Sequence, residues 1–368
     1  MRIESKIDRA TKAIINLSHL EHNYNLVKNG SDNRSIMGIV KANGYGHGIE
    51  KISKTIIDLG IKYLGVAYLE EALFLRNIGI TTPILVLGAI NSKQIRDYIE
   101  NDIDLTASSI DKALAIDSMA KICGKKAKVH IKIDTGMERI GVHWYNSEKF
   151  FKILSTLRNI EFKGLFSHLS SSDTDVKFTL DQISRFDESV KALNNLSIFP
   201  KYYHISNSYG LNYSFPQYIN MVRPGINLYG YGTTGLKPVM NLETEISYFK
   251  VVEKGSSISY NQTYKTKERT RVVTLPIGYG DGYLRSLSNK AYVYIRGNKY
   301  PQVGNICMDQ MMVDIGFNGT AYNGDKVLLM GSDGKNYIGA DSLAELAGTI
   351  SYEILCSLNN RVPRVYKN

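Results

Sequence analysis

The sequence predicts an α/β fold in which an N-terminal (β/α)8 barrel is followed by a mainly-β domain. The chain has 368 residues, which is long for one hydrophobic core, although barrels reach roughly 250 residues as one unit. Over the first 236 residues, short apolar runs alternate with segments of helical spacing. After about Leu236, closely spaced alternating runs replace them. We therefore divide the chain into domains 1–236 and 237–368.

Eight apolar, β-branched runs mark the strands of the predicted barrel: 36–40, 63–67, 84–87, 104–107, 128–133, 162–167, 202–205 and 222–228. The clearest helical segments between them are 69–77, 111–123, 147–158 and 180–193. This strand–helix alternation predicts a parallel (β/α)8 barrel, with an open doubly wound sheet as its main rival.

The second domain is predicted from alternating runs at 243–253, 257–260, 271–276, 292–296, 311–315 and 326–329. One helix, 340–347, interrupts these strands, and a basic segment, RVPRVYKN, closes the chain. A further apolar run at 13–17 precedes the first barrel unit and is a candidate to pack with the second domain.

Composition excludes several classes of protein. No apolar stretch reaches the roughly 18 residues of a membrane helix, and MRIESKIDRATK lacks the apolar region of a secretory signal, so we expect a cytoplasmic protein without membrane partners. The three cysteines lie far apart, which argues against disulfides and a zinc site, and we expect no metal. The net charge of +10 favours anionic small molecules, but the basic residues are scattered, so we expect no nucleic-acid partner.

Polar residues gather where barrel strands end, which is where active sites of such barrels lie. The sequence places them after the first, fifth, sixth and seventh strands and at the start of the eighth: Lys41, Arg139, His168, Asn207, Ser208 and Arg223. Each alone also has a structural interpretation, such as a solvated rim lysine or a hydrogen-bonded core histidine. Their joint placement predicts the site. Burial of Lys41 in a glycine-rich turn would lower its pKa, as a lysine that reacts with carbonyl groups requires.

Nine ordered motifs resemble the alanine racemase family of pyridoxal phosphate (PLP) enzymes over nearly the whole chain. They are VKANGYGHG at 40–48, KIDTGMERIGV at 132–142, SHLSSSD at 167–173, HISNS at 204–208, VRPGINLYG at 222–230, ISY at 258–260, PIGYGDG at 276–282, NICMDQ at 305–310 and RVPR at 361–364. The family combines a (β/α)8 barrel with a β domain, in agreement with the fold predicted above.

The resemblance implies a PLP cofactor bound covalently by Lys41, with Arg223 facing its pyridine nitrogen. The other residues that it assigns to the cofactor are Tyr45, His168, Asn207, Ser208, Gly225 and Ile226. His168 would support Arg223 by hydrogen bonding, and Lys132 matches a lysine that is often carbamylated in the family.

The resemblance also implies an amino-acid racemase with two proton-transfer groups, Lys41 for the D enantiomer and Tyr260 for the L enantiomer, because inversion needs an acid/base group on each face. It assigns substrate contacts to Arg139, Tyr279, Met308 and Asn360. Tyr260, Tyr279 and Met308 would come from the partner subunit of a homodimer. D-alanine for peptidoglycan is the expected product.

Three alternatives remain at this stage. Asn360 stands where many alanine racemases carry a tyrosine, which resembles serine racemases and predicts that serine is accepted besides or instead of alanine. A barrel-type PLP decarboxylase is disfavoured because Arg223, and not an acid, would face the pyridine nitrogen. A PLP-carrier protein of the single-barrel kind would need neither the second domain nor Tyr260.

Overall fold

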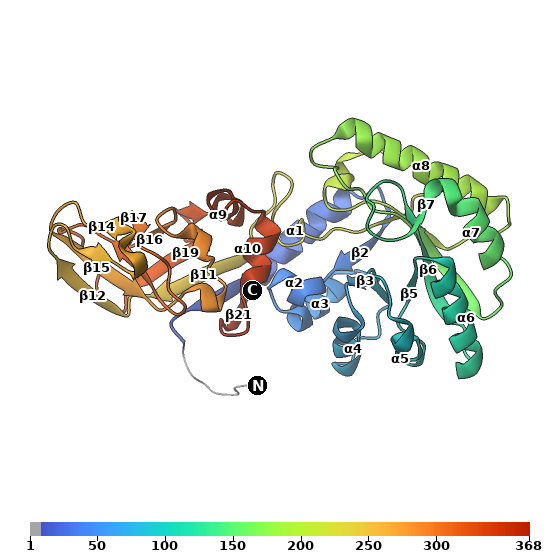
Figure 1. Cartoon of the computed structure of the whole chain (residues 1–368), viewed down its shortest axis with the longest axis horizontal. Helices are drawn as coiled ribbons and strands as arrows, with labels where there is room; N and C mark the ends of the chain where they lie inside the picture. The colour runs from blue at the N-terminus through green and yellow to red at the C-terminus, as the bar shows by residue number, and fades with distance from the viewer. Residues whose placement is uncertain (1–8) are drawn as a thin grey trace.

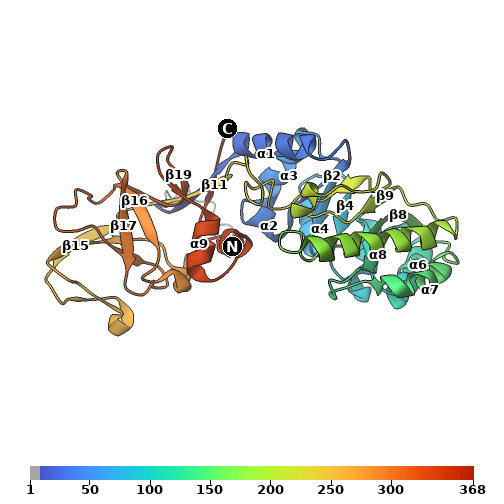
Figure 2. The same ribbon diagram turned by 90° about the horizontal axis from the view of Figure 1, so that it is seen from above.

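The computed structural model describes residues 9–368 and shows two bodies side by side, a barrel and a β domain (Figure 1). Residues 1–8 lie outside the described part. They include most of the segment MRIESKIDRATK, from which we expected no secretory signal. Helix α10 (Ser351–Ser357) lies between the two bodies. Viewed from above, helices surround the barrel strands, and the sheet of the second domain extends away from them (Figure 2).

Eight parallel strands form the barrel: β2 (Ser35–Ile39), β3 (Tyr63–Val66), β4 (Ile84–Val86), β5 (Leu105–Ala107), β6 (Ala127–Asp134), β8 (Ile160–Phe166), β9 (Tyr202–His204) and β10 (Met221–Val222). They pair in the orders β10-β2-β3-β4 and β5-β6-β8-β9. A bridge between Leu85 and Asp104 joins the two groups, and the Asn220 N–H donates to the Tyr203 carbonyl (3.2 Å) beside β9 and β10. The predicted barrel is confirmed, and the open sheet is wrong.

The last barrel strand is shorter than predicted. The run 222–228 was expected to be extended, but β10 ends at Val222. Beyond it the chain turns, since the Leu228 N–H donates to the Gly225 carbonyl and the Tyr229 N–H to the Ile226 carbonyl, both at 3.0 Å. The apolar side chains of this run are buried as a strand's would be, which is why the sequence pattern resembles one.

The barrel helices are α1 (Leu17–Asn29), α2 (Lys41–Tyr45), α3 (Ile49–Asp58), α4 (Leu69–Asn77), α5 (Ile95–Glu100), α6 (Ile110–Cys123), α7 (Ser147–Leu154) and α8 (Val176–Asn194). Local chemistry sets several of their ends. The Ser109 side chain accepts from the Lys112 N–H at the start of α6, and Gly124, with φ of 63°, ends that helix. At the start of α8, the Asp175 side chain accepts from the Phe178 N–H in the same way.

The second domain is a long sheet in the order β12-β15-β18-β17-β16-β19-β11-β1-β21. Its strands are β1 (Lys12–Asn16), β11 (Met240–Glu245), β12 (Tyr248–Val252), β15 (Thr270–Leu275), β16 (Tyr292–Ile295), β17 (Asn298–Val303), β18 (Met311–Asp314), β19 (Lys326–Ser332) and β21 (Arg364–Lys367). The remaining short strands of this domain are β13 (Ser257–Ile258), β14 (Tyr264–Lys265) and β20 (Tyr337–Ile338), whereas β7 (Val142–His143) pairs with β6 in the barrel. Helix α9 (Ala340–Ala347) has the predicted bounds.

Strand β1 lies inside this second sheet although it precedes the barrel in sequence. It pairs antiparallel with β11 and parallel with β21. Ala13 and Ile15 point into the core and are fully buried. The chain therefore enters the barrel from the β domain and returns to it, which ties the two bodies together at both ends.

No helix among residues 9–368 is long and apolar enough to cross a membrane. The three cysteines, Cys123, Cys307 and Cys356, are free.

Candidate active site

A cavity at the carboxyl ends of the barrel strands brings seven of the predicted residues together. Its lining includes Lys41, Tyr45, His168, Asn207, Ser208, Arg223 and Gly225, joined by Ile39, Leu87 and Tyr352. These residues follow β2, β4, β8, β9 and β10, with Tyr352 supplied by α10. The mouth of the barrel thus forms a site whose chemistry depends on a lysine, an arginine and several hydroxyl groups.

Lys41 is the first residue of the short helix α2, which directly follows β2. The backbone after it is tightly wound, with left-handed φ at Ala42, Asn43, Gly44 and Tyr45. Burial is the main cause that lowers the pKa of Lys41, and the Arg139 and Arg223 cations lower it further. The lowered pKa makes the neutral amine easier to form, and this is the form that attacks a carbonyl carbon or accepts a proton.

Arg223 is buried and held by four hydrogen bonds. Its guanidinium contacts Nδ1 of His204 (2.8 Å) and Nδ1 of His168 (3.1 Å), and it donates to the carbonyls of Ser167 (2.8 Å) and Ile205 (3.2 Å). Burial, followed by repulsion from Arg139, lowers its pKa to about 9. It remains charged at neutral pH in a fixed orientation.

Tyr45, Ser208 and Gly225 form one corner of the cavity. The Gly225 N–H donates to Oγ of Ser208 (2.9 Å). The Tyr45 ring stacks on Tyr229 with centroids 4.7 Å apart, and burial raises its pKa, so the hydroxyl stays a donor. Ile226 is buried next to Gly225 but does not line the cavity.

Both polar atoms of the Asn207 amide are hydrogen-bonded within the protein. Its Oδ1 accepts from Ser172 Oγ (2.8 Å) and from the Gly210 N–H (2.9 Å), and its Nδ2 donates to the Leu169 carbonyl (3.1 Å). This side chain fixes the loops after β8 and β9 and so shapes the wall of the cavity.

Asp134 on β6 supports the loop that carries Arg139, and Lys132 is buried two residues before it on the same strand. Asp134 accepts from the N–H groups of Gly136 (2.8 Å), Met137 (3.0 Å) and Arg139 (3.2 Å). Lys132 is 3% exposed and donates to the Ile133 carbonyl (2.8 Å), and burial is the main cause that lowers its pKa to about 7. Arg139 lines two hollows beside the cavity, one with Lys41 and one with His168 and Tyr352.

The cavity has the donor set that PLP needs. Positive groups dominate the cavity and its rim, since the Arg139 and Arg223 cations both lower the pKa of Lys41, and Arg139 also lowers that of Arg223. The nearby Glu71 carboxylate is occupied by the N–H groups of Ala42 (2.6 Å) and Ala67 (2.8 Å). A site with uncompensated cations, hydroxyl donors and a lysine of lowered pKa fits an anionic aldehyde cofactor.

Tyr260, Tyr279 and Met308 lie in the β domain and do not line the cavity around Lys41. All three are exposed, by 69%, 42% and 53%. Tyr260 begins the turn η4 (Tyr260–Gln262) and Tyr279 begins η5 (Tyr279–Asp281).

Hydrogen bonds join the loops that carry these three residues. The Asn305 amide donates to the Tyr260 carbonyl (2.9 Å), and the Tyr279 N–H donates to the Cys307 carbonyl (3.1 Å). Because the segment 305–308 contacts both turns, it also fixes the position of Met308. One chain thus presents the three residues together, away from its own Lys41.

Asn360 is exposed and lines none of the hollows that contain Lys41, Arg139 or His168. Tyr352, in contrast, lines the cavity, and its ring centroid lies 5.9 Å from that of Tyr45. Sequence reasoning missed Tyr352 because its position depends on α10 packing against α2. It also missed His204, although the residue lies in the HISNS motif and follows the same strand-end pattern as Ser208.

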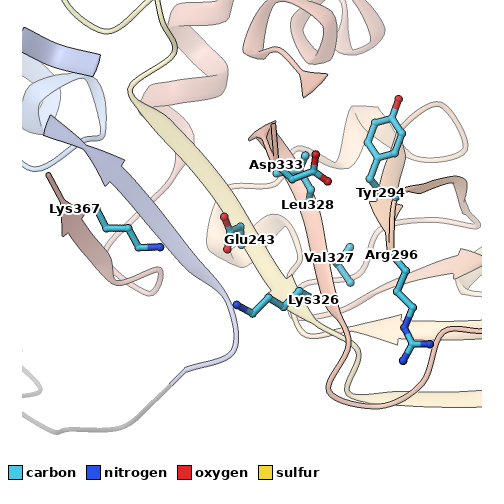
Figure 3. Close-up of a pocket in the computed structure, with 9 residues that line it drawn as sticks. Glu243, Tyr294, Arg296, Lys326, Val327, Leu328, Asp333 and Lys367 are labelled. Atoms are coloured by element: carbon cyan, nitrogen blue, oxygen red, sulfur yellow. The ribbon is translucent and has the colours of Figure 1, made fainter. Parts of the chain in front are cut away.

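A further hollow lies on the β domain, lined by Glu243, Tyr294, Arg296, Lys326, Asp333 and Lys367 among others (Figure 3). It contains no residue that the sequence predicted for the site. Its side chains carry charges of both signs and come from neighbouring strands of the sheet.

The sequence matches two family models in tandem, "Alanine racemase, N-terminal domain" over residues 15–233 and "Alanine racemase, C-terminal domain" over residues 239–366. It is 41% identical to "Alanine racemase" of Halothermothrix orenii, covering 100% of this chain and 99% of that protein, and 40% identical to "Alanine racemase 2" of Caldanaerobacter subterraneus subsp. tengcongensis, covering 97% and 95%.

Solved structures of alanine racemases resemble this structure over nearly its whole length. The alanine racemase of Clostridium difficile 630 superposes with a TM-score of 0.91 at 37% identity, covering 98% of this chain and 97% of that one. The alanine racemase of Bartonella henselae, solved with covalently bound pyridoxal phosphate, gives a TM-score of 0.89 at 28% identity, covering 97% and 99%. With both of its domains matched and relatives similar over their whole length, the chain belongs to the alanine racemase family.

Proposed function

We propose that the protein is a PLP-dependent racemase that interconverts L- and D-alanine. The observation that carries this proposal is the cavity at the barrel mouth, where Lys41, Arg223 and the Tyr45–Ser208–Gly225 corner surround one space. Family membership supports the same reaction, because relatives at about 40% identity are named alanine racemases.

PLP, when bound, supplies an electron sink that acidifies the α C–H bond of an amino acid. Lys41 would hold the cofactor covalently through Nζ, and Tyr45, Ser208 and the N–H groups around Gly225 and Ile226 would bind its phosphate. Arg223 has only donors and keeps its proton, so a pyridine nitrogen beside it stays an acceptor. That arrangement restrains charge delocalisation into the ring and favours proton return over side reactions.

The two proton-transfer groups are Lys41 and Tyr260 of the partner subunit. Lys41 Nζ takes the α-proton of D-alanine, and the Tyr260 hydroxyl serves the opposite face, where L-alanine carries its proton. Arg139 binds the substrate carboxylate, helped by Tyr279 and Met308 of the partner subunit. Because Tyr260, Tyr279 and Met308 are exposed on one chain and absent from its own cavity, the proposal requires a homodimer.

The preferred substrate follows from the cavity wall. Tyr352 lines the cavity and Asn360 does not, so the Asn360 amide that could hydrogen-bond a serine hydroxyl is not part of the wall. This favours alanine over serine. We further propose a cytoplasmic enzyme that supplies D-alanine for peptidoglycan.

The test is a parallel assay of the PLP-loaded protein in D₂O with L-alanine and with L-serine, following chirality and α-deuteration together. We expect inversion of alanine much faster than that of serine, with deuterium entering at Cα. Comparable serine inversion would make it a broad-specificity racemase. Absence of both inversion and deuteration would contradict the proposed function.

A further inference from the structure

A chain of buried side chains runs from Arg223 at the barrel mouth to Asp104 at its floor. The Arg223 guanidinium contacts His204 Nδ1 (2.8 Å), and His204 Nε2 contacts His130 Nδ1 (2.9 Å). His130 Nε2 lies 3.0 Å from the Tyr63 hydroxyl and 3.4 Å from Asp104 Oδ2, and the Tyr63 hydroxyl donates to Asp104 Oδ2. None of these five side chains is more than 3% exposed.

The chain spans the whole barrel interior. Arg223 and His204 stand at the carboxyl ends of β10 and β9, and His130 lies in the middle of β6. Tyr63 is the first residue of β3, and Asp104 directly precedes β5. The hydrogen bonds therefore link the catalytic face of the barrel to the opposite face.

Elementary hydrogen-bond chemistry gives this chain a single direction. A guanidinium can only donate, so His204 must accept at Nδ1 and, being neutral, carries its proton on Nε2. Burial and the Arg223 charge both lower the pKa of His204, in keeping with a neutral ring. His130 must then accept at Nδ1 and donate from Nε2.

The same logic continues to the barrel floor. Tyr63 accepts from His130 and donates its own proton to Asp104, and burial beside that carboxylate raises the pKa of the Tyr63 phenol. Every donor points from Arg223 toward Asp104, where the chain ends on an acceptor. No carboxylate among the described residues bonds Arg223 directly, since its partners are two histidine nitrogens and two carbonyls.

We infer that Asp104 is a positioning residue for the active site: as terminal acceptor it sets the tautomers of His130 and His204, and through them the orientation of Arg223. Without an acceptor at the floor, the forward chain leaves the Tyr63 proton with no buried partner, whereas a reversed chain leaves two donors facing each other between His204 and Arg223. Because both directions then contain an unmet buried donor, neither is strongly favoured and both become populated. A reversed chain would turn an N–H of His204 toward the guanidinium. The relation of Arg223 to PLP rests on the proposed function, but the direction of the chain does not.

The test compares Asp104→Leu with Asp104→Asn. Both variants lose the same charge, but only asparagine keeps an oxygen that accepts from Tyr63, so their difference isolates the acceptor. Thr106→Val is the matched control for core packing, because Thr106 lies two residues further on, is also buried, and among residues 9–368 its hydroxyl bonds the Val86 carbonyl (2.7 Å) and no other group.

The first readout is the ring-nitrogen NMR of 15N-histidine-labelled protein without PLP, in which seven histidines contribute. We expect His130 and His204 to carry their protons on Nε2 in the wild type, in Thr106→Val and in Asp104→Asn, and to show mixed tautomers in Asp104→Leu. His168 also accepts from Arg223 (3.1 Å) but lies outside the chain, so its signals should change least.

The second readout is the Kd for PLP, which should rise about tenfold in Asp104→Leu relative to Asp104→Asn, a change equal to about 1.4 kcal/mol. A proton on Nδ1 of His204 in the wild type would overturn the inference. So would an Asp104→Leu protein with wild-type tautomers, or, if that variant does not fold, an Asp104→Asn protein with altered tautomers. Racemase assays of the wild type and Thr106→Val test the proposed function separately, because the tautomers are measured without cofactor.

Discussion

The hydroxyl of Tyr45 occupies the space that a side chain at Gly225 would need: a Cβ added to Gly225 would lie 2.4 Å from Tyr45 Oη. The Tyr45 side chain has little room to move away, because its buried ring stacks on Tyr229 with centroids 4.7 Å apart. Gly225 is therefore required for close approach rather than for a left-handed backbone. This close approach brings a hydroxyl and the Gly225 N–H group together on one wall of the cavity.

Gly225→Ala should weaken PLP binding by about tenfold or more, because it displaces Tyr45 from the corner proposed to bind the PLP phosphate. A tenfold change in Kd corresponds to about 1.4 kcal/mol of binding free energy. Fluorescence titration of the PLP-free protein measures the Kd. Gly30→Ala is the control, because a Cβ there meets its nearest atom only at 3.5 Å. Equal Kd values for the two variants would contradict a role of this corner in phosphate binding.

Tyr260→Phe should separate inversion from proton exchange. Without the phenol, the face that serves L-alanine has no acid/base group, so inversion should fall by at least about 100-fold, the lower range for a general acid or base. D-alanine should still exchange its α-proton for deuterium through Lys41. Mass spectrometry with chiral chromatography in D₂O measures both.

The control for this change is Tyr248→Phe, another exposed tyrosine of the β domain, on β12. It should keep both activities. Full inversion by Tyr260→Phe in both directions would show that the two-base assignment is wrong.

The sequence predicted the barrel well because each strand–helix unit is locally encoded. Helices α4 and α9 have the predicted bounds, and α6 begins one residue before its predicted start. The segment RVPRVYKN was expected to be only a basic tail, yet Arg364–Lys367 forms β21. Its side chains are exposed or half-exposed, and its pairing with β1, about 350 residues away in sequence, leaves no local pattern.

The site residues also divide into those placed by local sequence and those placed by contacts between distant segments. Lys41, Ser208 and Arg223 directly follow barrel strands, so a topological rule places them together. Tyr352 is one of 25 tyrosines and reaches the cavity only through contacts between α10 and α2. Asn360, only eight residues further along, is exposed. Sequence position alone therefore could not decide which of the two lines the cavity.

The pKa of Lys132, lowered to about 7 mainly by burial, makes stability depend on pH. Between pH 7 and about 10, this lysine is neutral in the folded protein and protonated in the unfolded chain, so the unfolded state binds more protons and stability rises with pH. In CO₂-free buffer, denaturant unfolding should show this rise in the wild type relative to Lys132→Met. A pH-independent difference between the two would contradict a neutral Lys132.

Lys128→Met is the control, because Lys128 lies on the same strand but pairs with Asp102 (2.6 Å), and its pKa is raised. Lys128 stays charged in both states over this range and should add no slope. A neutral Lys132 amine can also take up CO₂ as a carbamate, releasing one proton. With 13C-bicarbonate, a carbamate NMR signal should appear in the wild type and be missing in Lys132→Met.

Substitutions at Tyr352 and Asn360 should affect the preference for serine or alanine differently. Tyr352→Asn replaces a phenol in the cavity wall by a shorter amide, which opens volume and adds hydrogen-bonding groups near the substrate side chain. It should raise the ratio of kcat/KM for serine to that for alanine by about tenfold, or about 1.4 kcal/mol. Asn360→Tyr should leave the ratio unchanged. A change in the ratio with Asn360→Tyr alone would restore position 360 as the specificity residue.

The separation of Lys41 from Tyr260 within one chain can be tested by mixing two inactive variants. In a homodimer with shared sites, Lys41→Ala and Tyr260→Phe chains form a heterodimer in which one site has both changes and the other has neither. After random reassortment, half of the dimers are heterodimers with one intact site of two, so about a quarter of the wild-type racemase activity should return. Each variant alone, and a mixture of Lys41→Ala with Lys41→Ala/Tyr260→Phe, should stay inactive. If the reassorted Lys41→Ala and Tyr260→Phe mixture also stays inactive while sedimentation shows dimers, the two groups do not belong to one shared site.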